Sequence, residues 1–375
     1  MTEPTPLQGD LAALDELLAN RRVLVVAGPG GVGKTTMAAA LGVRAARHHD
    51  RRVVVLTVDP ARRLAEALGM TQLVEEPILV PVGDRGRMWA LMVDMARGWD
   101  RVVEATAPDR ATVDRLFENR LYRTLTRRFI QSHDYIALDH LLSIDDDDRH
   151  DLVVIDTPPS RHAIDLIDAP GRMIEFFDSR LLRWLTAGAG SGLGGAAARP
   201  FLAVAERLLG GRFLTEIVEF FTLFSRLRPA FVERSRRVEA RLQAQDTAYV
   251  SVTTTDPPVV QGCEELIAGL GRRERRPSLL VVNRLLPGLR LRPPADTGPG
   301  WIVEDLATDG GDVVDDVEDP SLRRALDALV TRIDEAELPP SASDWPTVAV
   351  PLTPGDLTDV AGLTRLLGSD QPPAS

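Results

Sequence analysis

Short apolar runs, separated by longer stretches of helical periodicity, extend along most of the chain. The runs are rich in valine and leucine and lack polar residues at alternate positions, which is typical of strands buried on both faces of a parallel sheet. They occupy residues 23–27, 52–58, 88–93, 152–155, 248–253, 278–282 and 347–351. Because helical patterns separate most of them, the sequence predicts an α/β fold with a doubly wound, mainly parallel sheet, whose ligands bind at the carboxyl ends of the strands.

The helical patterns are longest at about 95–142 and 171–245, where we expect an α-helical subdomain inserted into a single domain of residues 1–375. An Ala-Pro-Gly sequence predicts a turn at 169–171, and a run of glycine and alanine predicts a flexible loop at 187–198. We further expect an acidic loop at 303–320, a helix at 321–337 and a disordered tail at 369–375. The many Phe and Leu residues of segment 172–234 indicate either a core of its own or a groove for a hydrophobic client.

Composition narrows the class of protein. The 375 residues carry a net charge of −11, which argues against a nucleic-acid partner because such proteins present a basic surface. A single cysteine, Cys263, excludes an internal disulfide and a metal site built from cysteines alone. The polar start of the sequence and the lack of a stretch of about 20 apolar residues predict a cytoplasmic protein with no integral membrane segment.

The loop after the first predicted strand carries the strongest chemical signal. Residues 28–36 read GPGGVGKTT and match the phosphate-binding pattern G-x-x-x-x-G-K-[ST] between a predicted strand and a predicted helix. In such a loop the backbone N–H groups of Gly30, Gly31, Val32, Gly33 and Thr36 surround phosphate, and Gly28 allows the tight turn. Lys34 reaches the terminal phosphates, and the Thr35 hydroxyl binds Mg²⁺.

Lysine usage supports this interpretation. Lys34 is the only lysine in the chain, and every other basic side chain is arginine or histidine. A compact ammonium group on a flexible stem fits inside a phosphate loop, whereas a broad guanidinium group does not. We therefore interpret residues 28–36 as an ATP-binding loop rather than an incidental glycine-rich turn.

Two aspartates follow apolar runs. Asp156 ends the run at 152–155, as a Mg²⁺-binding carboxylate does in P-loop proteins; alternatively, it is an ordinary aspartate that caps a turn. Asp59 follows the run at 52–58 and could orient the attacking water, or could cap the helix that begins near Ala61.

Other candidates carry weaker signals. Asn283, after the run at 278–282, could hydrogen-bond the edge of adenine or occupy a turn. Arg62, Arg63 and Arg161 follow the ends of predicted strands, where they could face phosphate or lie on a solvated surface.

Four motifs in series resemble the ArsA/Get-type ATPases, called anion-transporting ATPases, of the SIMIBI class of P-loop proteins. They are GPGGVGKTT at 28–36, TVDPARRL at 57–64, DTPPSRHAIDLIDAP at 156–170 and VVNRL at 281–285. The resemblance implies Mg²⁺ binding by Thr35 and Asp156, positioning of the hydrolytic water by Asp59, and adenine recognition by Asn283 beside the backbone of Pro351 and Leu352. It also implies a dimer that closes on ATP and joins its helical subdomains into a client site.

The sequence departs from the family pattern at three places. The first lysine of the family's loop reaches the partner's nucleotide, but its position here is Pro29, which supplies neither a cation nor an N–H donor. The CxxC zinc motif of the tail-anchored-protein targeting branch and the cysteines of the metalloid-pump branch are both absent, since Cys263 is the only cysteine.

Three functions are consistent with these observations. The first is an ATPase with weak turnover alone, which works as a homodimer or, with a paralogue that carries the missing lysine, as a heterodimer; alternatively, Arg62, Arg63 or Arg161 replaces the lysine within the chain. The second is a nucleotide-binding regulatory subunit without useful hydrolysis. The third is a targeting chaperone for hydrophobic clients.

Overall fold

A computed structural model describes residues 7–59, 61–128, 133–180, 211–286, 289–292, 302–305, 320–353 and 357–368. These residues form two compact units. The sheet unit contains the described residues up to Met92, Asp147–Ile164, and those from Gln245 onward. The helical unit contains Val93–Asp146 and the described part of Asp165–Ala244. The predicted flexible loop at 187–198 and the predicted tail at 369–375 lie outside the described residues.

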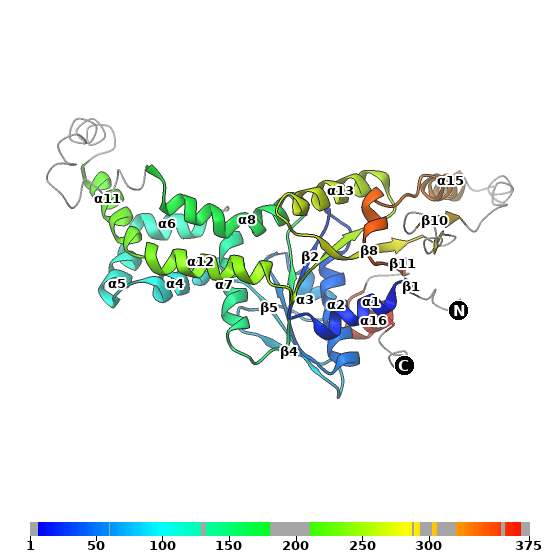
Figure 1. The fold of residues 1–375 in the computed structure, drawn as a ribbon, viewed down its shortest axis with the longest axis horizontal. Helices are drawn as coiled ribbons and strands as arrows, with labels where there is room; N and C mark the ends of the chain where they lie inside the picture. The colour runs from blue at the N-terminus through cyan, green and yellow to red at the C-terminus, as the bar shows by residue number, and fades with distance from the viewer. Residues whose placement is uncertain are drawn as a thin grey trace. The chain divides into compact units, whose positions relative to one another are not determined.

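Among the described residues, nine strands form the main sheet of the sheet unit (Figure 1). In spatial order they are β1 (Gln8–Gly9), β11 (Thr347–Pro351), β8 (Pro277–Leu285), β7 (Thr247–Thr253), β2 (Val23–Ala27), β6 (Leu152–Asp156), β3 (Arg52–Thr57), β5 (Arg87–Met92) and β4 (Ile78–Val80). All neighbouring pairs are parallel except β1 with β11 and β4 with β5. The predicted α/β class and mainly parallel sheet are confirmed.

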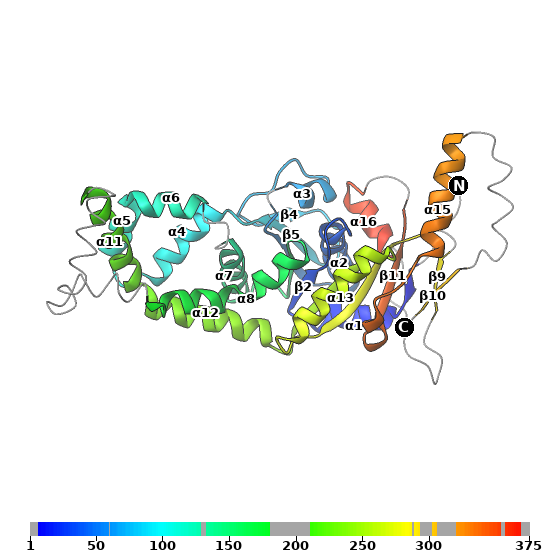
Figure 2. The ribbon, with the colours of Figure 1, turned by 90° about the horizontal axis from the view of Figure 1, so that it is seen from above.

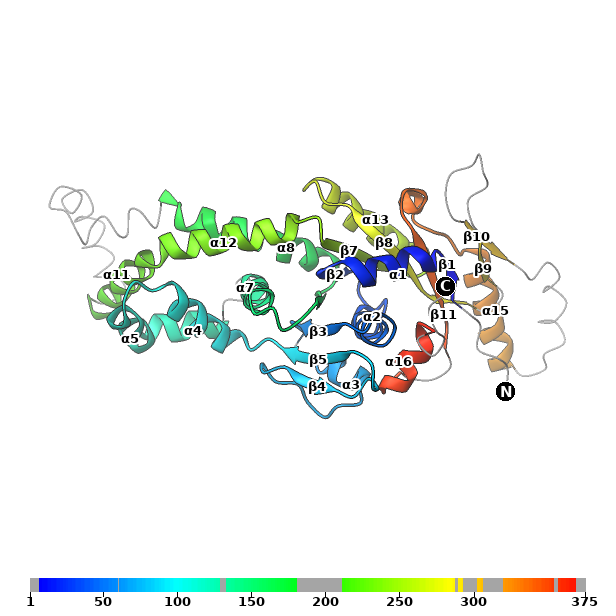
Figure 3. The same cartoon turned by 60° about the horizontal axis from the view of Figure 1, so that its bottom comes forward.

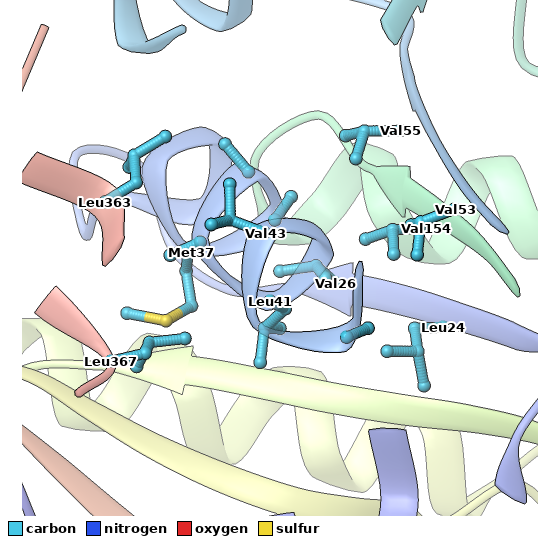
Figure 4. Packing of buried hydrophobic residues seen from close by; sticks show 14 of the residues in the cluster. Leu24, Val26, Met37, Leu41, Val43, Val53, Val55, Val154, Leu363 and Leu367 are labelled. Carbon is cyan, nitrogen blue, oxygen red and sulfur yellow. The ribbon is translucent and has the colours of Figure 1, made fainter. Parts of the chain in front are cut away.

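Helices cover both faces of this sheet. One face packs on α1 (Leu11–Asn20), α2 (Lys34–His49), α3 (Arg63–Ala67) and α16 (Val360–Leu366), and α2 and α16 lie side by side (Figure 3). Figure 4 shows the core around α2, which includes Leu24, Val26, Met37, Leu41, Val53, Val55, Val154, Leu363 and Leu367. The opposite face packs on α13 (Pro257–Gly271). Cys263 and Ile267 of this helix belong to a second cluster of buried apolar residues, which includes Leu280 and Val282 of β8. The strands are therefore buried on both sides, as their continuous apolar runs require.

Short elements complete the sheet unit. Strands β9 (Leu289–Arg292) and β10 (Ile302–Asp305) form an antiparallel pair, and η2 (Pro340–Asp344) precedes β11. Helix α15 spans Pro320–Asp334. The prediction of a loop throughout 303–320 is therefore wrong at both ends, where β10 and α15 lie, and residues 306–319 lie outside the described part of the chain.

The helical unit contains α4 (Met95–Thr106), α5 (Arg110–Glu118), α6 (Arg120–Arg128), α7 (His133–Asp145), α11 (Gly211–Arg226), α12 (Arg228–Gln243) and the part of α8 (Ser160–Phe177) from Asp165 onward. Helices α4, α7 and α12 contact one another, and α5, α6 and α11 gather beside each other (Figure 2). The core of this unit is aromatic and includes Trp99, Tyr135, Phe177, Phe220, Phe224 and Phe231, all buried. The Tyr135 and Phe231 rings stack with centroids 4.6 Å apart.

The turn predicted at 169–171 is wrong, because these residues lie inside α8. Pro170 removes one backbone N–H donor from this helix, which normally interrupts it. Arg172 bridges the affected turn by donating to the Asp165 side chain at 2.9 Å and to the Asp165 carbonyl. At the end of the helix, Phe177 is buried against Phe231, with ring centroids 4.8 Å apart. Tertiary packing of this kind stabilises a helix that local sequence alone would break.

Candidate functional site

The loop at residues 28–36 connects β2 to α2 at the carboxyl edge of the sheet. Gly31 and Gly33 adopt left-handed backbone conformations, with φ of 79° and 87°. Gly33 is the N-cap of α2 and has no side chain that could cap the helix. The first backbone N–H groups of this 16-residue helix therefore face the loop without a bond from the capping residue's side chain. Such a helix N-terminus favours anions.

Lys34 is buried beneath the loop, where its ammonium donates a hydrogen bond to the Pro29 carbonyl at 2.7 Å. Burial lowers the pKa of Lys34, and the nearby negative charge of Asp156 opposes that shift. The ammonium group therefore has a backbone carbonyl as its hydrogen-bond partner in this conformation. A phosphate oxygen is a stronger acceptor for this ammonium group, because it carries a negative charge and the carbonyl oxygen does not.

A pocket of about 1060 Å³ opens above the loop, entirely within the sheet unit. Most of the predicted site residues line it, namely Gly30, Gly31, Gly33, Lys34, Thr35, Thr36, Asp59, Asn283, Pro351 and Leu352. Gly28 and Val32 are buried in the loop and do not line the pocket. The pocket is large enough for a nucleotide, because small-molecule sites commonly measure about 300–1,000 Å³.

Asp156, at the end of β6, lies under Thr35. Its Oδ2 atom accepts hydrogen bonds from the Thr35 hydroxyl at 2.8 Å and from the Thr57 hydroxyl at 3.0 Å. Its Oδ1 atom is buried and has no hydrogen-bond partner among the described residues. Burial raises the pKa of Asp156 to about 6.

This corner has the chemistry of a magnesium site. A carboxylate and a hydroxyl are hard oxygen ligands, and the buried Oδ1 atom without a partner is an oxygen that a cation would satisfy. Within the described residues, no group of three or more His, Cys, Asp and Glu side chains could hold a metal by itself. Thr35 and Asp156 therefore fit Mg²⁺ that takes its other ligands from phosphate and water, which is the usual arrangement for this ion.

Asp59 lies on the loop after β3, where it lines the pocket. Its backbone N–H donates to the Thr57 hydroxyl at 3.2 Å, and its Oδ1 atom accepts from the Ala61 N–H at 2.9 Å. Its Oδ2 atom pairs with the Arg63 guanidinium at 3.2 Å. The carboxylate thus makes local bonds of the capping kind while it faces the pocket.

Asn283, at the end of β8, contacts the loop directly. Its side-chain N–H donates to the Val32 carbonyl at 2.7 Å, and its side-chain oxygen accepts from the Arg284 N–H at 2.9 Å. These two partners fix the orientation of the amide. A Cβ atom at Gly33 would lie 2.5 Å from the Asn283 side-chain nitrogen, so only glycine at position 33 permits this contact.

Three arginines were candidates for contact with phosphate. Arg63 lines the pocket, whereas Arg62 is exposed and does not line it. The side chain of Arg161 lies outside the described residues.

Thr57 and Arg284 belong to the site but are not among the residues that the sequence predicts for it. Thr57, the last residue of β3, holds Asp156, and its hydroxyl group at the carboxyl end of a buried strand was an available signal. Arg284 lines the pocket with a positive φ of 57°, a conformation that non-glycine residues seldom adopt outside functional or strained positions. Its place next to Asn283 in the motif at 281–285 was an available signal.

A buried parallel strand, a glycine-rich loop with Lys34-Thr35, a following helix and a carboxylate on the adjacent strand define the α/β fold of P-loop NTPases. The family model of the anion-transporting ATPases matches residues 21–291, and the chain belongs to this family. Within the described residues, no helix has both the length and the apolar character required to cross a membrane.

Of the three relatives described next, two are named as ATPases. The chain is 31% identical over 275 residues to "Uncharacterized protein SCO2128" of Streptomyces coelicolor, covering 71% of this chain and 63% of that protein. It is 24% identical over 154 residues to "ATPase ASNA1 homolog 2" of Paramecium tetraurelia, covering 40% and 44%. It is 24% identical over 300 residues to "ATPase GET3B" of Arabidopsis thaliana, covering 74% and 68%. The chain thus spans less than two thirds of the Streptomyces protein and less than half of the Paramecium protein.

Proposed function

We propose that this chain binds ATP with Mg²⁺ in the pocket above residues 28–36 and hydrolyses it. The observation that carries the proposal is the pair formed by Thr35 and Asp156 beneath the loop, with a buried carboxylate oxygen that lacks a partner. Membership of a family of ATPases supports the same reaction. The bound Mg²⁺ would neutralise phosphate charge, and Thr35 and Asp156 would hold it.

The side chains divide the remaining work. The Lys34 ammonium exchanges the Pro29 carbonyl for the terminal phosphates and stabilises the charge that develops there. The Asp59 carboxylate orients the attacking water by accepting its hydrogen bond, so that the water oxygen faces the γ-phosphorus as the bond to the β-phosphate oxygen breaks. Asn283 bonds the Val32 carbonyl of the loop and lines the same pocket as Pro351 and Leu352, beside which the base would lie.

Pro29 supports the proposal that the isolated chain turns over slowly. Pro29 is buried within its own chain, and its ring lies so close to α13 that a Cβ atom at Gly262 would be 3.2 Å from it. The resemblance places a lysine that reaches the partner's nucleotide at this position. A lost cation of this kind costs about 10³-fold or more in rate. We propose that a paralogue with that lysine supplies the cation in a dimer that closes on ATP.

A regulatory subunit without useful hydrolysis is the second candidate, and Pro29 is the observation that favours it. A targeting chaperone with a groove for hydrophobic clients has less support than these two candidates. Phe177, Phe220 and Phe224 of the helical unit are buried in its core. Among the Phe residues that the structure describes, Phe176 is the one with large exposure, at 39%.

Single-turnover hydrolysis of ATP separates the first two candidates. We expect slow, Mg²⁺-dependent phosphate release by the wild-type chain, and none by Asp59→Asn. ATP binding should survive in Asp59→Asn, since this residue acts on water. If wild type and variant both bind ATP normally but neither hydrolyses it, the chain is the regulatory subunit instead. Addition of the lysine-bearing paralogue tests the dimer, and Pro29→Lys in this chain should raise the rate if the chain pairs with itself.

A further inference from the structure

Asp59 and Arg63 both line the pocket and form an ion pair at 3.2 Å, so each holds the other away from a role in hydrolysis. The Asp59 side chain is 27% exposed, and both of its oxygens are engaged by its own loop, one by the Ala61 N–H and the other by the Arg63 guanidinium. A carboxylate has about four lone-pair positions, so these two donors leave room for a water molecule. The Arg63 guanidinium nevertheless covers the Oδ2 side of Asp59 and offsets the negative charge with which this carboxylate would attract and polarise that water.

Arg63 is positioned to reach phosphate. It lines the same pocket as Gly30, Lys34 and Thr35, and 64% of its side chain is exposed, so no packing holds it against Asp59. The guanidinium group therefore lies near the place where the terminal phosphates of ATP would bind.

The two possible partners of Arg63 differ in strength. An exposed ion pair of the Asp59–Arg63 kind contributes at most about 1 kcal/mol. A terminal phosphate offers more negative charge and two oxygens that match the fork of a guanidinium group. ADP lacks that phosphate, so exchange of partners depends on the γ-phosphate.

We propose that Arg63 is a γ-phosphate-sensing positioning residue. It pairs with Asp59 in the nucleotide-free chain and moves to the terminal phosphate of ATP, which releases the Asp59 carboxylate to orient the attacking water. The inference depends on the proposed binding of ATP in this pocket. It selects Arg63 from the three arginines that sequence reasoning left open, and it couples phosphate recognition to water activation within one loop.

Nucleotide affinity measures the proposed exchange directly. Arg63→Gln should weaken binding of ATP, or of a non-hydrolysable analogue, by about 10- to 100-fold, the effect of one charge-assisted hydrogen bond, and should leave ADP affinity within about twofold. Single-turnover hydrolysis should slow at saturating ATP. The matched control is Arg62→Gln, which removes an equal charge from the adjacent, exposed residue and should change neither affinity.

A double-mutant cycle shows whether Arg63 leaves Asp59 when ATP binds, or attracts ATP without leaving Asp59. Asp59→Asn removes the competitor for Arg63 and should tighten ATP binding by about two- to fivefold, because the lost competitor is an exposed ion pair. The same change in the Arg63→Gln background should leave ATP affinity unaltered. If Asp59→Asn tightens ATP equally in both backgrounds, Arg63 does not exchange partners and the inference is wrong.

Four further outcomes would overturn the inference, one of them together with the proposed function. Equal loss of ATP and ADP affinity in Arg63→Gln would show that Arg63 does not sense the γ-phosphate, as would equal effects of Arg62→Gln and Arg63→Gln. Failure of the wild-type chain to bind either nucleotide would refute the proposed function as well. A wild-type chain that hydrolyses ATP, with an Arg63→Gln variant that keeps the same preference for ATP over ADP, would refute the role of Arg63 alone.

Discussion

Replacement of Asp156 by asparagine should change the pH dependence of stability in a predictable direction. The carboxylate is 1% exposed, and its Oδ1 atom has no partner within the described residues. Burial therefore raises its pKa from 3.8 to about 6. Because the folded state binds this proton more tightly than the unfolded state, the stabilisation is complete below pH 3.8 and is lost as the pH rises through 6.

The size of the effect follows from the shift. A difference of about 2 pKa units corresponds to about 3 kcal/mol in the free energy of unfolding. About 2 kcal/mol of this falls between pH 4.5 and 7.5. Asparagine does not titrate, and its side-chain oxygen can still accept from the Thr35 and Thr57 hydroxyls. The free energy of unfolding of Asp156→Asn minus that of wild type should therefore rise by about 2 kcal/mol over this pH range.

Urea denaturation of the nucleotide-free chain in EDTA, at several pH values, measures this difference. The contributions of the other titrating groups cancel in this difference, since both proteins contain those groups. Asp139 provides a matched control: it is also buried, but both of its oxygens bond Arg234. Asp139→Asn breaks a buried ion pair and should destabilise the helical unit by about 3 kcal/mol.

A difference between Asp156→Asn and wild type that stays constant from pH 4.5 to 7.5 would refute the reasoning, since it would show that the Asp156 charge costs nothing in the folded state. The same variant should lose the Mg²⁺ dependence of ATP binding. A gain in stability joined to a loss of ligand binding is the expected behaviour of a site whose buried charge serves a ligand.

Three other substitutions test separate contacts. Gly33→Ala should abolish nucleotide binding in equilibrium dialysis, because it forces a side chain into a left-handed backbone and within 2.5 Å of Asn283. Asn283→Ala should weaken binding of inorganic tripolyphosphate as well as ATP, since Asn283 holds the Val32 carbonyl; a residue that only reads adenine would leave tripolyphosphate binding unchanged. Phe231→Ala should lower the stability of the helical unit by about 3–5 kcal/mol in urea denaturation, because Phe231 is at the centre of the aromatic core.

The parts of the fold that the sequence predicted well are those fixed by local pattern. The bounds of β2 and β11 match their predicted ranges, because a strand buried on both faces needs an uninterrupted apolar run. Strands β1 and β4 were missed, since two or three residues at a sheet edge carry no periodicity. Pro170 predicts a turn because proline disfavours a helix, whereas the contacts that keep α8 intact come from residues outside that turn.

In the candidate site, too, the features fixed by local spacing could be predicted and the contacts between distant residues could not. The spacing of residues 28–36 is local, so the loop could be identified directly. The contact between Asn283 and Val32 joins residues 251 positions apart, and no spacing rule predicts it. The ion pair of Asp59 and Arg63 spans four residues and was within reach of sequence reasoning, but its significance depends on which arginine faces the pocket.

The pocket keeps three charged groups in contacts weaker than the ones they can make. Lys34 bonds a carbonyl, Asp156 has one buried oxygen without a partner among the described residues, and Arg63 pairs with Asp59 at an exposed position. Each arrangement lowers the stability of the nucleotide-free state relative to a complexed one, so a ligand that satisfies all three should stabilise the chain strongly. ATP with Mg²⁺ supplies a matching charge to each group, whereas ADP supplies no γ-phosphate for Arg63. The rise in melting temperature should therefore be larger with Mg·ATP than with Mg·ADP in wild type, and Arg63→Gln should reduce that difference.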